Sequence, residues 1–343
     1  MVEYTKKAMT NHEHLAQWES RGLTIPDRER ALRYLSHISY YRLSAYAIPF
    51  CKPGQSNHTF NAGVSFDNIL NLYIFDRELR LLVMDAIERI EVSVRASLCN
   101  YMSITHNSSP FWYLEERHFK KEYGHKRLLS DLEKEISSER KRYQDDVRHL
   151  ERRTNINEEQ RASLMENIKK ETFLRHYICS YDQPRLPPCW MMVEMLSWGS
   201  LSFLYGGLKK VSEQKAIAKN LGSNAELLES WLRAFNVIRN HCAHHNRLWN
   251  REFGLSVKIP TSNKIKWLNR VPKLANQIRY EKRIYPVLVA IQSLLYTISP
   301  SSAWAVRLRE LLSEFSEVSL TNMGIPEDWD QDPFWEDALK NTD

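Results

Sequence analysis

Residues 66–104 read FDNILNLYIFDRELRLLVMDAIERIEVSVRASLCNYMSI. Apolar side chains recur in this stretch at steps of three and four residues, from Ile69 to Leu98, as they do on one buried face of a helix. The opposite face alternates acidic and basic side chains, which is typical of a solvated helix surface. The stretch therefore predicts one long amphipathic helix.

The rest of the chain repeats this helical signal. Helices are predicted in three further regions: two within residues 10–50, the second starting at Pro26-Asp27 and ending at Pro49; one over residues 190–206, after three prolines; and two over residues 262–315, separated at Ser299-Pro300-Ser301. No strand-like alternation or hairpin turn recurs in the sequence. We therefore expect an all-α fold with little sheet.

Residues 115–175 are highly charged and poor in core residues, which predicts a protruding helical hairpin with its turn near Thr154–Asn157. Its basic clusters make it the best candidate arm for contacts with an RNA backbone; they comprise Lys120, Lys121, Lys126, Arg127, Arg140, Lys141 and Arg142. Arg77 and Arg80 of the long helix could line the RNA path as well. In both regions interspersed acids leave an ion-paired, solvated surface as the alternative.

These patterns divide the chain into three regions. An N-terminal helical segment spans residues 1–60, a helical core that holds the charged insertion spans residues 61–255, and C-terminal helices with an acidic tail span residues 256–343. With 10 glycines and 13 prolines in 343 residues, the chain shows few seams between independent domains.

Composition excludes several classes of protein. A chain that is 43% hydrophobic and 26% charged is ordinary for a folded, soluble protein. No apolar run approaches the roughly 18 residues of a membrane span, and residues 1–7 lack a signal-peptide core, so we expect a cytoplasmic protein without membrane contact. The five scattered cysteines form no CxxC motif and predict reduced thiols rather than a disulfide framework or a zinc site. No metal or other cofactor is expected.

The charge is distributed unevenly along the chain. From Glu310 onward there are ten acidic residues and one base, Lys340, so this tail carries −9; the whole chain carries +6, which leaves +15 on the remaining body. A basic body of this kind can bind a polyanion by neutralising phosphates and releasing counterions. The tail is either an acidic cap that competes with RNA, or a solvated end held by its aromatic residues.

Residues 236–250 read NVIRNHCAHHNRLWN and hold the densest chemistry in the chain. Arg239, Asn240 and His244 place a fixed cation, an amide and a titratable imidazole within about one and a half helical turns. These groups are suited to handling a phosphodiester. The candidate accessory residues nearby are His245, Asn236 and Arg247.

A helix around this segment is predicted from its surroundings. Ser223 and Glu226 form a capping-box start, and apolar side chains then recur on one face as far as Leu248. A second, polar stripe recurs at four-residue intervals and consists of Asn236, Asn240 and His244. Arg239 lies roughly 140° around the helix from His244, so one helix alone gives a loose pocket. A second copy packed across a two-fold axis would bring two such sets together, which predicts a homodimer.

The segment resembles the signature of the HEPN superfamily, whose nuclease members carry an Arg, a polar residue (often Asn) and a His four to six positions after the Arg. The chain as a whole is similar to abortive-infection Abi proteins of the AbiD/AbiF type. Further blocks carry this similarity in order along residues 20–253: SRGL at 20–23, ALRYL at 31–35, YYRLSAY at 40–46, FDRELR at 75–80, AIERIE at 86–91, PCW at 188–190, Glu194, and SWGSLS at 197–202.

The resemblance implies a HEPN-like helical bundle that acts in bacterial anti-phage defence as an RNA-cleaving toxin. Some relatives are thought to be held in check by a small partner RNA encoded beside them, so such a regulator is an implied partner. Carried over to this chain, the resemblance places Arg239 and His244 in the catalytic pair and Asn240 at the polar position. The doubled histidine makes His245 an alternative, although spacing from Asn240 favours His244.

RNA carries its own nucleophile, the 2′-hydroxyl beside the scissile phosphate. A ribonuclease without a metal needs a base, an acid and a cation on the phosphate, which an imidazole and Arg239 can supply. We therefore expect 2′,3′-cyclic phosphate ends and no metal requirement. In an alternative arrangement Arg239 and the imidazole polarise the phosphate while water activates the 2′-hydroxyl.

Two other classes of function stay open. A metal-dependent hydrolase could use His241 with His244 or His245, but the HExxH pattern and a nearby acidic cluster are missing. A non-catalytic RNA- or protein-binding helical module would also be served by the basic body. Nucleophilic catalysis by Cys242 is disfavoured, because its place on the apolar stripe indicates a packed, unreactive thiol.

Overall fold

The computed structural model describes residues 3, 7–54, 57–269 and 280–340. Fourteen α-helices account for most of this part of the chain, and the only β-type pairings within it are three isolated bridges. The expected all-α class is confirmed. Residues 1–2 and 4–6 of the N-terminal segment, residues 270–279 of the helical region expected over 262–315, and Asp343 of the tail lie outside the described residues.

The helices follow one another in this order: α1 (Asn11–Ser20), α2 (Arg28–Ile38), α3 (Tyr40–Ala47), α4 (Phe66–Thr105), α5 (His125–Glu151), α6 (Glu158–Lys170), α7 (Phe173–Ser180), α8 (Cys189–Met195), α9 (Trp198–Gly207), α10 (Val211–Asn220), α11 (Ala225–Ala243), α12 (Tyr285–Ile298), α13 (Trp304–Glu314) and α14 (Pro333–Ala338). Short 3₁₀ turns connect several of them. None of the described helices is long and apolar enough to cross a membrane.

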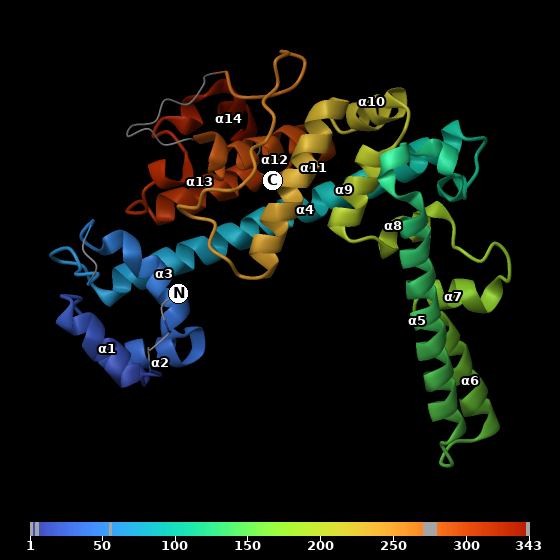
Figure 1. The fold of residues 1–343 in the computed structure, drawn as a ribbon, viewed down its shortest axis with the longest axis horizontal. Coiled ribbons are helices and arrows are strands. Elements are labelled where there is room, and N and C mark those ends of the chain that lie inside the picture. Colours follow the sequence, from blue (N-terminus) through green and yellow to red (C-terminus); the bar gives the residue numbers. More distant parts are fainter. Residues whose placement is uncertain (1–2, 4–6, 55–56, 270–279, 341–343) are drawn as a thin grey trace.

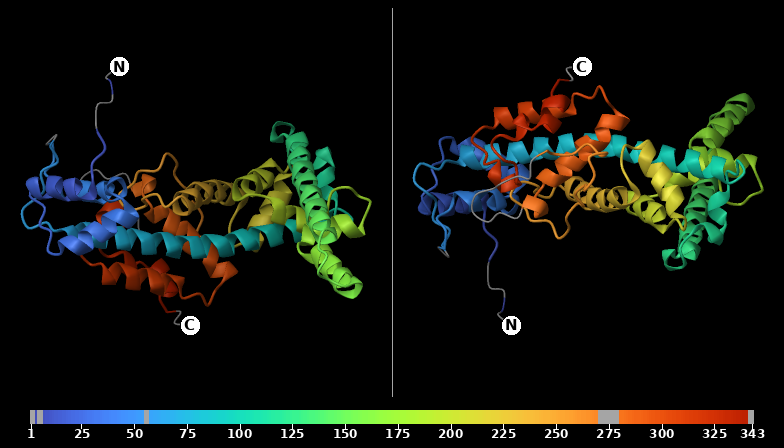
Figure 2. Two further views of the ribbon diagram at one scale, coloured as in Figure 1. Left: turned by 90° about the horizontal axis from the view of Figure 1, so that it is seen from below. Right: turned by 90° about the horizontal axis from the view of Figure 1, so that it is seen from above.

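Helix α4 is the spine of the molecule, and its bounds confirm the long helix predicted over residues 66–104. It begins at a capping box in which the backbone N–H of Ser65 donates to the Asn68 side chain at 2.9 Å. The apolar stripe from Ile69 to Leu98 is buried, and α3, α8, α9, α10, α11, α12 and α13 pack against the helix. Figures 1 and 2 show α4 running through most of the length of an elongated molecule.

The N-terminal region contains three α-helices where two were expected. The second predicted helix is interrupted at Ser39, whose φ of 74° lies in the left-handed region. The Ser39 side chain then accepts a hydrogen bond from the backbone N–H of Arg42 and caps α3. The interruption turns α3 back onto α4, which it contacts over the YYRLSAY block at residues 40–46.

The charged insertion forms the predicted hairpin, with α5 and α6 packed against each other and their connection at residues 152–157. It begins later than expected, because residues 112–123 form 3₁₀ turns and Gly124 starts α5 with a φ of 72°. Lys120 and Lys121 therefore lie at the base of the hairpin and not on its arm. Figure 1 shows the hairpin and the N-terminal helices at opposite ends of α4, both extending to the same side of it.

The apolar helix expected over residues 190–206 is divided in two. Ser197 adopts an extended conformation between α8 and α9, and its hydroxyl accepts from the backbone N–H of Ser200 at 3.2 Å. A serine that caps a new helix in this way competes with continuation of the old one. The break lets α9 pack along α11, where the Trp198 indole donates to the carbonyl of Leu232 at 2.8 Å.

The C-terminal region lies against the other side of α4 from the hairpin (Figure 1). Helices α12 and α13 pack on α4, with the expected break between them at residues 299–303, but residues 262–269 are irregular rather than helical. The aromatic residues of the tail, Trp329, Phe334 and Trp335, are buried, so the tail is anchored to the body as far as α14. The three-region division of the chain stays a prediction.

Candidate active site

Helix α11 carries the candidate catalytic residues. It is capped by Asn224, whose side chain accepts from the backbone N–H of Leu227 at 2.9 Å, so the cap lies one residue after the expected Ser223. Its apolar face, from Leu227 to Cys242, is buried against α4, α9, α10 and α12. The helix ends at Ala243, earlier than the apolar pattern predicted. Leu248, the last apolar position of that pattern, is buried but belongs to the segment after the helix.

The end of α11 closes in a Schellman-type turn. The backbone N–H of His245 donates to the carbonyl of Cys242 at 2.9 Å, and that of Asn246 donates to the carbonyl of His241 at 2.8 Å. His244 is the C-cap residue, and His245 has a φ of 56° at the position that glycine usually occupies. A non-glycine residue in this conformation is strained, and such strain is common at functional sites.

The three candidate catalytic side chains are accessible to a ligand. Arg239 is half-buried, and Asn240 and His244 are exposed on the last turn and cap of α11. Among the residues that the structure describes, none of these three side chains makes a hydrogen bond or an ion pair. Asn236 of the same stripe is half-buried beside Gly199 of α9, where an added Cβ would lie 3.5 Å from its amide oxygen.

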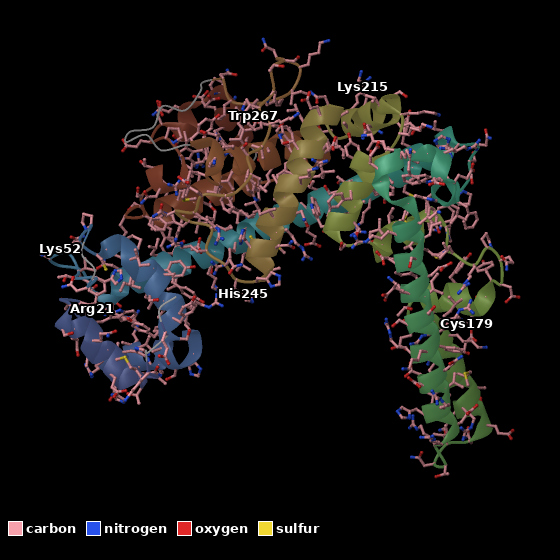
Figure 3. All side chains as sticks on the ribbon, in the orientation of Figure 1. Arg21, Lys52, Cys179, Lys215, His245 and Trp267 are labelled. Carbon is pink, nitrogen blue, oxygen red and sulfur yellow. The ribbon has the colours of Figure 1, made fainter. Side chains whose placement is uncertain are left out.

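The segment after α11 is held against α3 by two arginines. An Nη1–H of Arg42 donates to the carbonyl of His245 at 2.6 Å, and an Nη1–H of Arg247 donates to the carbonyl of Ala45 at 2.6 Å. Arg247, a candidate accessory residue, therefore has a structural contact of its own. Figure 3 shows His245 at the end of α11, on the side of α4 towards which the N-terminal helices and the hairpin extend.

A buried carboxylate on α4 also holds the segment that follows α11. Asp76 is fully buried and accepts the backbone N–H groups of Leu248 at 3.0 Å and of Trp249 at 2.7 Å. It also accepts from the Tyr46 hydroxyl at 2.7 Å and forms an ion pair with Arg80. Arg80, which the sequence offered as a lining of the RNA path, is thus largely buried and its charge is matched by Asp76.

These elements enclose a pocket of about 630 Å³ between α2, α3, α4 and the end of α11, which we call the α2–α4 pocket. Its lining residues are His37, Ile38, Arg42, Tyr73, Arg77, Arg80, Leu81, Met84, Cys242, Ala243 and His245. The pocket unites His245 with Arg77 and Arg80 from the candidate set, whereas Arg239, Asn240 and His244 are not among its lining residues.

Sequence reasoning missed His37 and Arg42. His37 stands six residues after Arg30, but Arg30 pairs with Asp67 at 2.7 Å and does not line the α2–α4 pocket. The only earlier signal for Arg42 was its place in the YYRLSAY block at residues 40–46. Both residues precede α11 by about two hundred positions, so no local spacing rule could have connected them with it.

The hairpin cations are mostly solvent-exposed and do not line the α2–α4 pocket. Arg142 pairs with Glu135 and Glu139, both at 3.0 Å, and Arg127 lies 3.7 Å from Asp131. Lys120 donates from Nζ to the carbonyl of Gly206 at 2.7 Å. The remaining members of the predicted arm, Lys121, Lys126, Arg140 and Lys141, are exposed. A role of the hairpin in RNA binding stays a prediction.

Neighbouring residues bear on the alternative chemistries. Burial raises the pKa of the Cys242 thiol to about 12, which keeps it protonated and unreactive at neutral pH. Burial, and then the charges of Arg251 and His244, lower the pKa of His241, whose ring packs 5.8 Å from that of Phe253. No three His, Cys, Asp or Glu side chains of the described chain gather as a metal site.

The left-handed conformation of His245 leads to a stability prediction. Replacing His245 with glycine should leave the free energy of unfolding equal to wild type or raise it by up to about 1 kcal/mol, because glycine adopts this φ without steric strain. His245→Ala keeps the strain and should be about 1 kcal/mol less stable than the glycine variant. Urea unfolding measures both values, and an alanine variant more stable than the glycine variant would contradict the assigned turn.

The comparison with known families bears on the whole of this site. The family model described as Abi-like protein matches residues 33–250, which is more than half of the chain. The chain belongs to the Abi-like protein family. The matched range runs from α2 to the segment after α11, so this Abi-like protein has every residue of the α2–α4 pocket inside the family region.

Membership of the Abi-like family implies a role in abortive infection and defence. Neither the curated proteins nor the solved structures contain a significant match to this Abi-like protein.

Proposed function

We propose that this Abi-like protein is a metal-independent endoribonuclease that acts as an abortive-infection effector. The observation that carries the proposal is the set formed by Arg239, Asn240 and His244 at the end of a buried helix. These three side chains lie on the accessible last turn and cap of the helix and have no hydrogen-bond or ion-pair partner in the described chain, so they are available to contact a phosphate. The resemblance of this segment to the HEPN nuclease signature supports the same proposal.

The proposed reaction uses the 2′-hydroxyl of the substrate. An imidazole, His244 or its neighbour His245, accepts the 2′-hydroxyl proton while O2′ forms a bond to phosphorus. The bond from phosphorus to O5′ breaks, and the 5′-oxygen leaves with a proton supplied by an imidazolium or by water. The Arg239 guanidinium stabilises the charge that develops on the phosphate oxygens, and Asn240 orients the phosphate or the imidazole. The products are a 2′,3′-cyclic phosphate and a 5′-hydroxyl.

Each active site is proposed to be formed by residues of two chains. Arg239 and His244 lie five residues apart on one helix and point in directions separated by roughly 140°, so a single α11 presents them loosely. Two α11 helices packed across a two-fold axis would place Arg239 of each copy near His244 of the other. A homodimer, an RNA substrate and a small regulatory RNA are the partners of this proposal.

A cleavage assay in EDTA tests the function directly. Wild-type protein incubated with mixed cellular RNA should cut it without added metal and leave cyclic phosphate ends, because the proposed groups are all supplied by the protein and the 2′-hydroxyl. Arg239→Ala should lower the cleavage rate by about a hundredfold to a thousandfold, since it removes the cation that stabilises the transition state.

The matched control is Arg309→Ala, which removes an exposed arginine from α13, far from α11 in sequence. It should cleave at the wild-type rate. Cleavage that EDTA abolishes and one metal restores would favour the hydrolase alternative. Intact RNA in every lane, with tight RNA binding, would favour the non-catalytic binding module.

A further inference from the structure

The lining of the α2–α4 pocket includes Ala243 and His245, the two chain neighbours of His244, but most of it comes from other elements. Its volume of about 630 Å³ falls within the range of sites that hold small ligands. His37 comes from α2, Arg42 from α3, Arg77 from α4 and His245 from the turn after α11. The hairpin and the C-terminal helices contribute nothing to its lining.

The lining of the pocket holds basic side chains and no acidic ones. Three guanidinium groups and two imidazoles line the pocket, and no lining residue carries a carboxylate. Asp76 behind the wall matches the charge of Arg80, and Glu78 pairs with Arg77 at an exposed position where such a pair is weak. The contact of Arg42 with the His245 carbonyl uses one N–H and leaves its charge without a carboxylate partner in the described chain.

The fold fixes the position of Arg42 in the pocket. Arg42 is half-buried and bonded to the His245 carbonyl at 2.6 Å, and the left-handed turn at His245 sets the direction in which its side chain leaves the backbone. Strained backbone held in place by surrounding contacts is common at ligand sites. Tyr73, Leu81 and Met84, which lie on α4 beside Arg77, add largely apolar surface to the lining that can receive a ribose or a base.

By comparison, the larger cavity at the root of the hairpin, about 880 Å³, is lined by four carboxylates and three cations: Glu122, Asp131, Glu135, Glu229, Lys120, Arg127 and Arg233. Its acids offset its bases, so it offers an anion no net attraction. Of the two cavities, the α2–α4 pocket is the one with the chemistry of a phosphate site.

We propose that the α2–α4 pocket binds a phosphate group next to the scissile one, with Arg42, Arg77 and His37 as its ligands and His245 at its border with the catalytic set. The identification of this phosphate as part of an RNA strand rests on the proposed ribonuclease function. The N-terminal helices α2 and α3 thereby become part of the substrate site. A substrate phosphate held there fixes the register of the strand at Arg239 and His244.

Binding of a strand that cannot be cleaved separates this inference from catalysis. The probe is a single-stranded oligonucleotide whose riboses all carry 2′-O-methyl groups, titrated into the full-length protein at several salt concentrations. The double variant His37→Ala with Arg77→Ala should bind it about tenfold more weakly, and the slope of log affinity against log salt should fall by about 0.7 for each lost phosphate contact. Both side chains are exposed, so the variant should fold normally.

The matched control is His12→Ala with Arg309→Ala, which removes the same two residue types from exposed positions on α1 and α13. It should bind like wild type. Inorganic phosphate, added as a competitor, distinguishes the sources of the ligand. Displacement of the oligonucleotide at millimolar phosphate means that the pocket takes any phosphate group, and the absence of displacement means that it recognises the phosphate within a strand.

Equal affinities for wild type, the pocket variant and the control variant would overturn the inference. The cleavage assay on ordinary RNA is read separately. Loss of binding in the pocket variant together with no cleavage by wild type would retain the phosphate site and reject the ribonuclease. Normal binding by the pocket variant together with cleavage that depends on Arg239 would reject the phosphate site and retain the ribonuclease.

Discussion

Replacing His244 with alanine should lower the rate of RNA cleavage by at least about two orders of magnitude, the usual scale for a general acid–base group. The fold should be unaffected, because the His244 side chain is exposed and makes no hydrogen bond or ion pair with the described residues. RNA affinity should remain near that of wild type. Single-turnover cleavage of one defined oligonucleotide measures the rate, and thermal unfolding monitors the fold.

His245→Ala is the matched variant, since the two histidines are adjacent and both exposed. Under the proposed assignment it weakens substrate positioning more than chemistry, because His245 lines the α2–α4 pocket. A larger loss of single-turnover rate in His245→Ala than in His244→Ala would move the catalytic role to His245. Wild-type cleavage by both variants would remove the imidazole from the mechanism.

Mixing two inactive variants tests whether two chains share a site. A dimer of Arg239→Ala with His244→Ala holds one site in which an intact Arg239 from one chain meets an intact His244 from the other. If the proposed dimer is correct, mixing the two variants restores part of the wild-type activity, whereas each alone stays inactive. A mixture that stays inactive, although the chains exchange, would place both residues of a site in the same chain.

Replacing Asp76 with alanine should destabilise the protein by about 3–5 kcal/mol, the usual cost of removing one partner from a buried ion pair. The change leaves the Arg80 guanidinium buried without its carboxylate and removes the acceptor for the backbone N–H groups of Leu248 and Trp249. Because that segment carries the turn with His244 and His245, cleavage should fall as well. Urea unfolding of the variant measures the loss.

The matched control lies on the same helix. Asp85 and Arg89 form an ion pair of the same i, i+4 spacing at 2.8 Å, but both side chains are about one-third exposed. Asp85→Ala should therefore cost at most about 1 kcal/mol. The double variant Asp76→Asn with Arg80→Met keeps an acceptor and removes the buried charge, so it should recover part of the loss. Equal effects at Asp76 and Asp85 would mean that the buried network does not anchor the segment.

The long helix α4 was predicted nearly to the residue, and so was the turn of the charged hairpin. Both depend on periodicity and composition within one continuous stretch, which the sequence displays directly. The breaks at Ser39 and Ser197 were not predicted. At each of these positions a serine hydroxyl caps the following helix. Whether such a capping residue interrupts a helical pattern depends on what the two resulting helices can pack against, and that is a tertiary property.

The candidate active site likewise combines features that local sequence predicts with features that depend on tertiary packing. The sequence by itself determined which chemical groups stand together on α11, because Arg239, Asn240 and His244 are close along one helix. Only the tertiary structure decided that α11 ends at Ala243, that His245 adopts a left-handed conformation, and that this residue lines a cationic pocket. The bond from Arg42 to His245 spans 203 residues, and that from Leu248 to Asp76 spans 172. Contacts over such separations depend on how α3 and α11 pack on α4. The local pattern of side chains does not predict that packing.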